Sequence, residues 1–322
     1  MAKVSPVAVS VVIRSYNRLD ACIELINVIL KQDFEDFEIV VIEQSTNVSD
    51  GQQAELENLQ TTNDRLRILK YPPLGPARAR NEGWKMARGE VVVFCDDDDI
   101  PMDTAWLSAH MKNYSDPDII GVSGREVMDP NETCGYSNRK RARRMCLSYD
   151  FFGYPNVYCR LDERVDKVDW LHGGNASVRR SFIERVGGWQ GNMVDHEEHS
   201  FAFRLVKILR GKQRLIFDPT PVVLRRKDIP GGLDRRAQTP FEFFFLWFIY
   251  VHRIVARYRP FRVILLYAVY YFWLQGISIH KLWKLPERRQ RSLTGKLALN
   301  IWILLIFPVW FMLGWITFLK KR

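Results

Sequence analysis

The stretch GEVVVFCDDDD, residues 89–99, determines the fold that we expect. Residues 91–94 form a β-branched and aromatic run that predicts a buried strand, and four aspartates follow it directly. The preceding residues 76–87 predict a helix, with Pro76 in its first turn and Gly89 after its end. A helix and a buried strand that ends in carboxylates are typical of an α/β protein with a ligand site at the strand ends.

Similar elements precede this stretch. Residues 7–13 and 38–42 predict buried strands, residues 66–69 predict a short third strand, and residues 19–31 predict a helix. Alternating strands and helices indicate a mostly parallel sheet with helices on both faces. Because the carboxyl ends of parallel strands meet at one edge, we expect the polar clusters 15–18, 43–46 and 96–99 to line one crevice.

The next part of the chain is less periodic. Residues 129–168 predict an irregular excursion over the site, followed by helices at 176–186 and 197–209. Pro219 and Pro221 mark a last short edge segment. We therefore expect one folded part over residues 1–224, followed by a tail at 225–322.

Composition supports a folded protein with an unusual tail. The 322 residues are 47% hydrophobic and 26% charged, which excludes a disordered or fibrous chain. The net charge is +10, but residues 225–322 hold 18 basic and 4 acidic residues, a net of +14. The remaining 224 residues carry a net charge of −4. This asymmetry predicts an anionic partner for the tail.

The tail also contains three uncharged segments. Residues 297–319 would reach about 34 Å as a helix, enough to cross a hydrocarbon core of about 30 Å. Residues 263–279 are borderline in length, and residues 243–251 suit an interfacial helix. Buried core helices are the alternative, but residues 302–311 are apolar on every helical face. We therefore expect membrane association, with anionic lipids as partners.

The topology of the tail stays open between two full crossings and a shallow or re-entrant insertion. Basic flanks favour the cytosol, and residues 281–296 between the two longer segments carry six basic residues and one acidic residue. No signal peptide is visible, so we expect residues 1–224 on the cytosolic face of the membrane. Nucleic acid is not an expected partner, because the uncharged segments are too long for a groove-binding element.

The five cysteines do not predict a metal or redox site. They are Cys22, Cys95, Cys134, Cys146 and Cys159, and no C-x-x-C spacing occurs. Cys22 and Cys95 fall in apolar periodic segments and should be core residues. A disulfide among the other three stays an alternative that the cytosolic location disfavours.

The four aspartates carry the first chemical prediction. Neighbouring carboxylates repel one another, and a divalent ion with oxygen ligands, Mg2+ or Mn2+, would relieve the repulsion. Such an ion commonly holds substrate phosphates as well. A solvated acidic loop is the alternative, in which Asp99 or Asp103 caps a helix.

Five motifs in this order resemble the family 2 glycosyltransferases, which have the GT-A fold. They are VSVVIRSYNR (9–18), EIVVIEQST (38–46), GPARARNEGWKMARGEVVVFCDDDD (75–99), GGNASVRRSFIERVGGW (173–189) and EEHSFAFR (197–204). The resemblance covers about the first 225 residues, and five ordered motifs are more specific than the aspartates alone. It implies that residues 1–224 are a GT-A catalytic domain, with a nucleotide-sugar half at about 1–128 and an acceptor half at about 129–224.

The resemblance implies roles for individual residues. The residues expected to bind the donor are Ser15, Tyr16, Asn17, Glu43, Arg80, Asp96, Asp97, Gly174 and Asn175. Glu43 stands where the family usually has an aspartate that contacts the base. Asp98 is expected to bind the metal, with a one-residue shift to Asp99 left open. Arg225 stands roughly where related enzymes often carry a histidine.

The resemblance also places a catalytic base on the last motif. Glu197 and Glu198 match the family's acidic pair, and the second acid is usually the base, so we expect Glu198 to take the acceptor proton. First-turn acids that complement a helix dipole are the alternative. Trp170 and Trp189 could stack on a sugar or pack in the core.

These expectations combine into one function. We predict a metal-dependent inverting glycosyltransferase that uses a nucleotide-diphospho-sugar, with UDP or GDP as the nucleotide. The acceptor is expected to be a glycan or a polyprenyl-linked glycan. The alternative is a nucleotide-sugar-binding membrane scaffold that has lost catalysis, although both acidic motifs are intact.

Overall fold

The computed structural model describes residues 7–132, 138–149, 155–156, 159–191, 197–226 and 229. All of these except Tyr149 belong to one compact unit, within residues 1–148 and 155–231. The three uncharged tail segments at 243–251, 263–279 and 297–319 lie outside the described residues. Among the residues that are described, no helix has the length and apolar character needed to cross a membrane.

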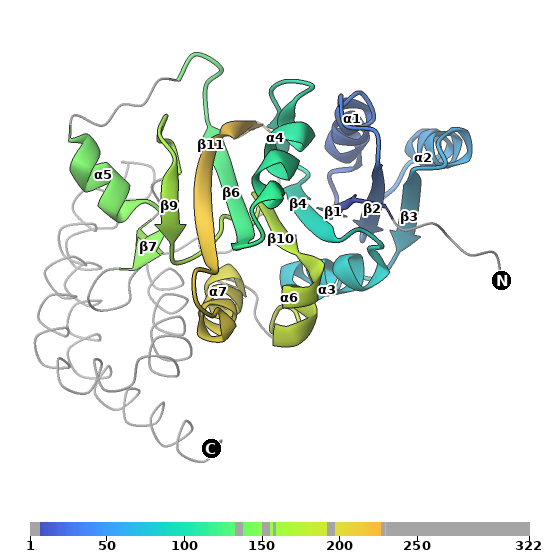
Figure 1. Cartoon of the computed structure of the whole chain (residues 1–322). Helices are drawn as coiled ribbons and strands as arrows, with labels where there is room; N and C mark the ends of the chain where they lie inside the picture. The colour runs from blue at the N-terminus through green and yellow to red at the C-terminus, as the bar shows by residue number, and fades with distance from the viewer. Residues whose placement is uncertain are drawn as a thin grey trace, which may run out of the picture. The chain divides into compact units, whose positions relative to one another are not determined.

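A nine-stranded mixed sheet forms the centre of this unit (Figure 1). Its strands are β1 (Val9–Ser15), β2 (Phe37–Glu43), β3 (Leu66–Lys70), β4 (Val91–Asp96), β5 (Asp99–Pro101), β6 (Ile119–Val127), β9 (Val165–Val168), β10 (Asn175–Arg179) and β11 (Arg214–Arg225). Their order is β3-β2-β1-β4-β10-β6-β11-β5, and β9 also pairs with β11. The pairs among β1 to β4 and the β6–β11 pair are parallel, whereas β5, β9 and β10 run antiparallel to their neighbours.

Helices cover both faces of the sheet. They are α1 (Leu19–Ile29), α2 (Asp50–Thr62), α3 (Pro76–Met86), α4 (Trp106–Lys112), α5 (Arg139–Met145), α6 (Arg180–Val186) and α7 (Glu197–Ile208), with a 3-10 turn at Asn113–Ser115. Figure 1 shows α1, α2 and α4 on one side of the sheet and α3, α6 and α7 on the other. β7 (Ser148–Tyr149) and β8 (Pro155–Asn156) form a separate two-stranded sheet.

Because helices cover both faces of the sheet, its strands are apolar without interruption. Val9, Val11 and Ile13 of β1 belong to the main core cluster, together with the buried face of α1. Val12 points the other way, and a side chain on Gly83 of α3 would collide with it. Because side chains alternate across a strand, both faces of β1 must be apolar. The prediction of a mostly parallel α/β sheet is confirmed.

Most predicted elements are confirmed with shifted ends, but two are wrong. Residues 176–179 of the expected helix at 176–186 belong to strand β10, because β4 and β6 supply hydrogen-bonding partners on both sides. The expected short edge segment is the twelve-residue strand β11, which pairs with β6 and β5. Pro219 and Pro221 fall where the β6 ladder is interrupted, between Phe217 and Val222.

The cysteines of the described residues are free, buried thiols: Cys22, Cys95, Cys146 and Cys159. Burial raises the pKa of Cys146, and also that of Cys159 to about 12. Cys134 lies outside the described residues. The disulfide alternative therefore has no support among the described cysteines.

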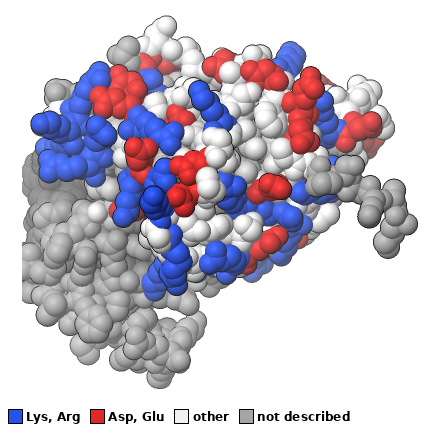
Figure 2. All heavy atoms as spheres, viewed as in Figure 1, with Lys and Arg blue, Asp and Glu red and all other residues white. Residues whose placement is uncertain are grey.

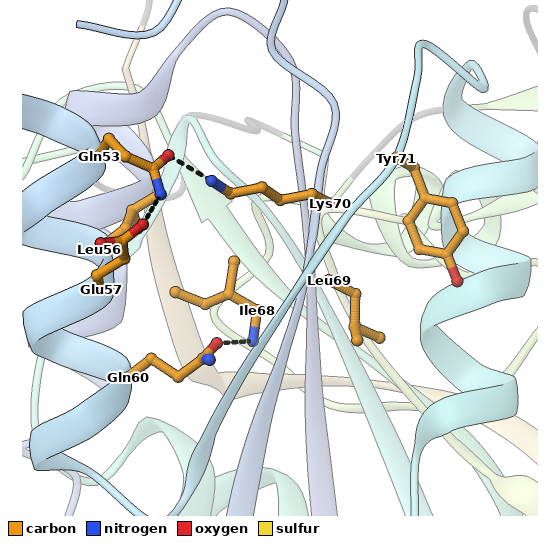
Figure 3. Close-up of a pocket in the computed structure, with 8 residues that line it drawn as sticks. All are labelled: Gln53, Leu56, Glu57, Gln60, Ile68, Leu69, Lys70 and Tyr71. Carbon is orange, nitrogen blue, oxygen red and sulfur yellow. Dashed lines mark hydrogen bonds between the residues drawn. The ribbon is translucent and has the colours of Figure 1, made fainter. Parts of the chain in front are cut away.

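A cavity of about 560 Å3 lies between α2 and the edge strand β3. In Figure 3, Gln60 of α2 accepts a hydrogen bond from the backbone N–H of Ile68, and Lys70 donates to Gln53. The Gln60 contact gives one backbone N–H of this edge strand a hydrogen-bonding partner. None of the lining residues belongs to the site predicted from the sequence.

Candidate active site

The polar clusters at the strand ends meet at one edge of the sheet, as predicted. Ser15 at the end of β1 is in register with Glu43 at the end of β2, and Arg14 is in register with Asp96 of β4. The clusters also bind one another, because the backbone N–H of Asn17 donates to Ser45 Oγ at 2.8 Å.

The first cluster combines a buried floor with exposed side chains. Ser15 and Glu43 are buried, and Glu43 Oε1 accepts a 2.6 Å hydrogen bond from the Ser45 N–H. Asn17 adopts a left-handed backbone with φ of 55°, a conformation that asparagine tolerates better than most residues. Tyr16 is 49% exposed, so its ring is open to a ligand.

Asp96 and Asp99 are each clamped by an arginine. Both carboxylate oxygens of Asp96 accept from Arg14 at 2.8 Å, and those of Asp99 accept from Arg225 at 2.9 and 2.8 Å. Burial opposes ionisation of Asp96, but Arg14 and Arg80 outweigh it and hold the pKa of Asp96 well below its usual range. Burial dominates at Asp99 and raises its pKa well above the usual value, although Arg225 acts in the opposite direction.

The two middle aspartates share a different arginine. Arg18 Nη1 lies 3.2 Å from Asp97 Oδ1 and 2.9 Å from Asp98 Oδ2. Asp97 is buried, and its burial raises its pKa to about 6 in spite of the Arg18 charge. The side chain of Asp98 is 22% exposed, more than those of the other three aspartates. The four aspartates are thus chemically distinct.

The aspartates have a composition and spacing that suit a divalent ion. Oxygen atoms of Asp96, Asp98 and Asp99 lie within 4.8 Å of one another. The site as a whole contains more acids than bases: Asp96, Asp97, Asp98, Asp99, Glu126, Glu197 and Glu198 against Arg14, Arg18, Arg80 and Arg225. This excess negative charge and the hard oxygen ligands fit Mg2+ or Mn2+.

Arg80 of α3 connects the aspartates to helix α7. Its Nη2 lies 3.2 Å from Asp96 Oδ1 and 3.3 Å from Glu198 Oε1, and its Nη1 lies 2.5 Å from Glu197 Oε1. The guanidinium is almost completely buried. Arg80 therefore fixes the aspartate cluster and the acidic pair relative to each other.

The two glutamates differ in accessibility. Glu197 is buried against Arg80, whereas the side chain of Glu198 is 24% exposed. Arg204, about two turns from the start of α7, donates to the carbonyls of Val186, the last residue of α6, and of Gly188 just beyond it. These hydrogen bonds tie α7 to the end of α6. Asp195 and His196 lie outside the described residues.

Gly173 and Gly174 permit close approach of charged side chains. A Cβ on Gly173 would overlap Glu198 and Arg80, and one on Gly174 would overlap Asp99 and Arg225. The requirement for small residues is therefore explained by the protein's own side chains.

Asn175, predicted to bind the donor, is a structural residue. Its amide donates to the carbonyls of Arg125 and Pro221, and its oxygen accepts from Trp106 Nε1 and bonds His110 Nε2, all at 2.9–3.0 Å. The side chain is fully buried, so it is not available to a ligand.

The two tryptophans pack in the core. Trp189 stacks on Phe201 with a centroid distance of 4.1 Å, and Trp170 contacts His199 edge-on at 4.4 Å. Both are buried, so the alternative of core packing is the correct one.

Arg14, Arg18 and Arg225 form part of the site although the motifs did not assign them roles. Arg225 also lies 3.2 Å from Glu126, which in turn lies 3.3 Å from His172. A basic residue at the end of an otherwise apolar run, such as Arg14 after residues 7–13, was the signal available in the sequence.

A separate basic surface lies over α5. Figure 2 shows basic side chains gathered there, and the helix sequence RKRARRM supplies five of them, all exposed. Asp162 and Glu163 pair with Arg139. Among the described residues, Lys140, Arg141 and Arg144 have no acidic partner.

The sheet, the aspartates at the end of β4 and the acidic start of α7 define a GT-A-like α/β fold. Residues 10–187, more than half of the chain, match Glycosyl transferase family 2, and the chain belongs to this family. A mannosyltransferase from Pyrobaculum calidifontis, solved with GDP-Man and Mn2+, is 19% identical with a TM-score of 0.54, over 97% of this chain and 86% of that one.

Two curated relatives are similar over shorter stretches. The GalNAc(5)-diNAcBac-PP-undecaprenol beta-1,3-glucosyltransferase of Campylobacter jejuni is 37% identical over 92 residues, which are 28% of this chain and 29% of that protein. The glucosyl-dolichyl phosphate glucuronosyltransferase of Haloferax volcanii is 26% identical over 204 residues, 57% of this chain and 56% of that protein. The chain therefore spans less than two thirds of either relative.

Proposed function

We propose that the chain is a metal-dependent inverting glycosyltransferase. It transfers a sugar from a UDP or GDP sugar to a glycan or polyprenyl-linked acceptor at the cytosolic face of a membrane. The observation that carries this proposal is the bridge by Arg80 from Asp96 to Glu197 and Glu198. It places a donor-side carboxylate and two candidate bases around one buried cation.

Glu198 is the group best placed to act as the base. It is the more accessible acid of the pair, and Arg80 holds its Oε1 at 3.3 Å. In the proposed reaction, Glu198 takes the proton of the acceptor hydroxyl. The acceptor oxygen then bonds to the anomeric carbon as the bond from that carbon to the diphosphate breaks. The nucleoside diphosphate leaves, and the configuration at the anomeric carbon is inverted.

Asp98 is the residue that would hold the metal. Asp96 and Asp99 already use both carboxylate oxygens on arginines, so Asp98 has the largest unused binding capacity of the three. When bound, Mg2+ or Mn2+ supplies positive charge for the leaving diphosphate. Arg80 and Arg14 hold Asp96 ionised and fixed beside this position.

The acceptor and the location are inferred from the relatives and the tail. The names of both curated relatives refer to undecaprenol or dolichyl phosphate. The basic tail and the uncharged segment at 297–319 support a membrane location with anionic lipids as partners. The exposed cations of α5 add a basic surface to the catalytic unit.

A donor screen tests the proposal. Purified full-length protein is mixed with UDP and GDP sugars in the presence of Mn2+, and its thermal unfolding midpoint and the release of nucleoside diphosphate are recorded. One nucleotide sugar should raise the unfolding midpoint. The protein should also release nucleoside diphosphate from it, either by slow hydrolysis or by transfer of its sugar. Stabilisation without any turnover, with lipid-linked acceptors supplied, would favour the inactive scaffold instead.

A further inference from the structure

Helix α5 has one buried side, and its other surface is strongly basic. Ala142 of α5 is buried, and so is Cys146, which directly follows the helix. At about 100° per residue, these two positions lie on the same side of the helix. The rest of the helix carries five basic residues, all exposed, and no acidic residue: Arg139, Lys140, Arg141, Arg143 and Arg144.

Two of the five cations are paired with acids of the protein. Arg139 and Arg143 lie within about 80° of the buried side around the helix. Arg139 contacts Glu163 at 2.8 Å and Asp162 at 3.1 Å, and Arg143 lies 3.8 Å from Glu163. The protein's own carboxylates therefore serve the cations that lie beside its body.

The other three cations, which we call the outer cations, are Lys140, Arg141 and Arg144. They lie about 120–180° from the buried side of α5. No acidic side chain in the described part of the chain pairs with them. Residues 1–224 carry a net charge of −4, so this basic surface is a local concentration and does not follow from the composition of the unit (Figure 2).

The charges of α5 oppose the formation of their own helix. Like charges four positions apart, such as Lys140 and Arg144, repel each other. The first turn contains no acid, and its cations face the positive end of the helix dipole. Asp162 and Glu163 relieve this repulsion only near Arg139 and Arg143. An anionic surface against the outer cations would relieve the remainder.

The side chains of α5 suit lipid headgroups better than nucleic acid. The seven residues include no aromatic ring to stack on a base and no asparagine or glutamine to read a base edge. Clustered Lys and Arg are what anionic membranes attract, and each such residue near the surface increases binding about five-fold. The tail, with its net charge of +14, is expected to meet the same kind of surface.

Backbone hydrogen bonds connect the end of α5 to the chain that enters the active site. The carbonyl of Leu147, two residues after α5, accepts from the N–H groups of Asp169 and Trp170 at 2.9 and 3.3 Å. This segment continues to Gly173, where an added Cβ would overlap Glu198. A surface bound by α5 is therefore bound close in the chain to the candidate base.

We propose that the outer cations of α5 bind the anionic headgroups of a phospholipid bilayer. This membrane contact is separate from the tail and lies on the catalytic unit itself, so it sets how the active site faces the membrane. The inference rests on the proposed function, because it takes the protein to work at a membrane surface.

Hydrogen exchange in the full-length protein tests this contact. The protein is mixed with lipid nanodiscs of phosphatidylcholine alone, or of phosphatidylcholine with phosphatidylglycerol. Co-elution with the discs reports membrane binding by any part of the chain. Mass spectrometry then measures the exchange of the amides at 139–145. The ratio of the rates in the two kinds of disc cancels differences in the intrinsic stability of α5 between variants.

Three variants separate the outer cations from charge in general. The first replaces all three outer cations with glutamine, which keeps a high helix propensity. The second keeps the charge and exchanges lysine for arginine and arginine for lysine at the same positions. The matched control removes three positive charges from exposed lysines outside α5: Lys31→Gln, Lys112→Gln and Lys212→Gln.

In the wild type, the α5 amides should exchange at least about ten-fold more slowly in anionic discs than in neutral discs, because three cations each add about five-fold to binding. High salt should remove this protection. The glutamine variant should show no difference between the discs, whereas the charge-conserving variant and the lysine control should behave like the wild type.

Equal exchange in both discs for the wild type, or full protection in the glutamine variant, would overturn the proposal. An equal loss of protection in the lysine control would overturn it as well, because net charge would then be the cause. The same holds if a mixed-sequence single-stranded RNA protects α5 and anionic discs do not.

Co-elution separates this inference from the proposed function. If the protein co-elutes with both kinds of disc but α5 is not protected, the role of α5 is wrong and the membrane location stands. If it co-elutes with neither, the membrane location in the proposed function is wrong, and the role of α5 is wrong with it.

Discussion

Gly174 and Asp99 lie in direct contact, so close that a methyl group on Gly174 would overlap Asp99 Oδ2. Asp99 is fully buried, and Arg225 binds both of its oxygens. The same methyl group would also reach Arg225. The buried ion pair between Asp99 and Arg225 therefore requires glycine at position 174.

Substitution Gly174→Ala should destabilise the protein. The added methyl must displace Asp99 or Arg225, and strain in a packed interior costs about 1–3 kcal/mol, more if a buried charge loses its partner. Denaturant unfolding measures the change. Gly51→Ala in α2 is the control, because nothing lies within 4 Å of its added Cβ. That change should be neutral or stabilise the helix by up to about 1 kcal/mol. Equal unfolding midpoints for Gly174→Ala and the wild type would contradict the role of this contact.

Glu198→Gln should reduce turnover without loss of the donor site. Glutamine keeps the shape of the side chain but cannot take a proton, so we expect turnover to fall by roughly 10²-fold or more. Donor affinity, measured by calorimetry, should stay within a few-fold of the wild type. Glu197→Gln should reduce turnover less than Glu198→Gln does. It should reduce the free energy of unfolding more, because Glu197 is the buried partner of Arg80. A larger turnover loss for Glu197→Gln would reverse the two roles, and no loss in either would leave Asp195 as the next candidate.

Removal of the metal should abolish transfer. With EDTA in excess we expect no product, and added Mn2+ or Mg2+ should restore it, because the leaving diphosphate needs a positive charge. Asp98→Asn should lose metal-dependent donor binding while its unfolding midpoint stays near that of the wild type. Asp166→Asn, an exposed change on β9, is the control. Full activity in excess chelator would show that this enzyme does not use a metal.

Glu38 gives a prediction about acid stability away from the site. Burial would raise the pKa of Glu38, but hydrogen bonds from Ser10 and Arg88 and the charge of Arg67 lower it below its usual value. A lowered carboxyl pKa adds stability that is present above the unfolded-state pKa and lost as the pH falls through the folded-state pKa.

Glu38→Gln should therefore cost about 1–3 kcal/mol of unfolding free energy at pH 7. The difference from the wild type should shrink below about pH 4.3, the ordinary value for a glutamate. Urea unfolding at several pH values measures this. Glu184→Gln, at an exposed pair on α6, should show almost no change. A cost for Glu38→Gln that is independent of pH would mean that packing, and not charge, is what Glu38 contributes.

Local patterns predicted the elements that bury a continuous apolar run and missed those that do not. The strands around residues 9–13 and 91–94 are recognisable because both faces are covered. Helix α2 has a single buried residue, Leu56, so it has no apolar stripe; its signal was the capping box of Ser49 and Gln52. β10 is too short for its period to identify it, and its partners β4 and β6 decide its conformation.

The motifs predicted which residues meet, but not how they are paired. Arg14 and Arg225 are 82 and 126 residues from the aspartates that they clamp, so no local pattern reveals those contacts. Without them the four aspartates cannot be told apart by sequence. Asn175 shows the opposite error, since its motif suggested a ligand contact where the fold uses all of its hydrogen bonds.

The end of β11 at Arg225 provides a test of the domain boundary expected at residue 224. Residues 1–224 omit Arg225, which pairs with Asp99 and Glu126, and Arg226, whose N–H donates to the Asp98 carbonyl at 2.8 Å. We expect a fragment of residues 1–226 to be folded and extractable without detergent. A fragment of residues 1–224 should be less stable by about 3–5 kcal/mol, or fail to accumulate, because it leaves a buried carboxylate unpaired. Equal urea unfolding midpoints for the two fragments would support the expected domain boundary at residue 224.

Arg225→Gln in the 1–226 fragment isolates the side chain from the backbone contact. Burial raises the pKa of Asp99 and the charge of Arg225 lowers it, so without the arginine the pKa should rise further. The folded state should then hold a proton there that the unfolded state releases. A raised carboxyl pKa makes the stability fall as the pH rises above the unfolded value of about 3.9. Urea midpoints from pH 4 to pH 8 should therefore drop more steeply for Arg225→Gln than for the unaltered fragment. Parallel pH profiles would show that Arg225 does not change the pKa of Asp99, and that it stabilises the strand by packing alone.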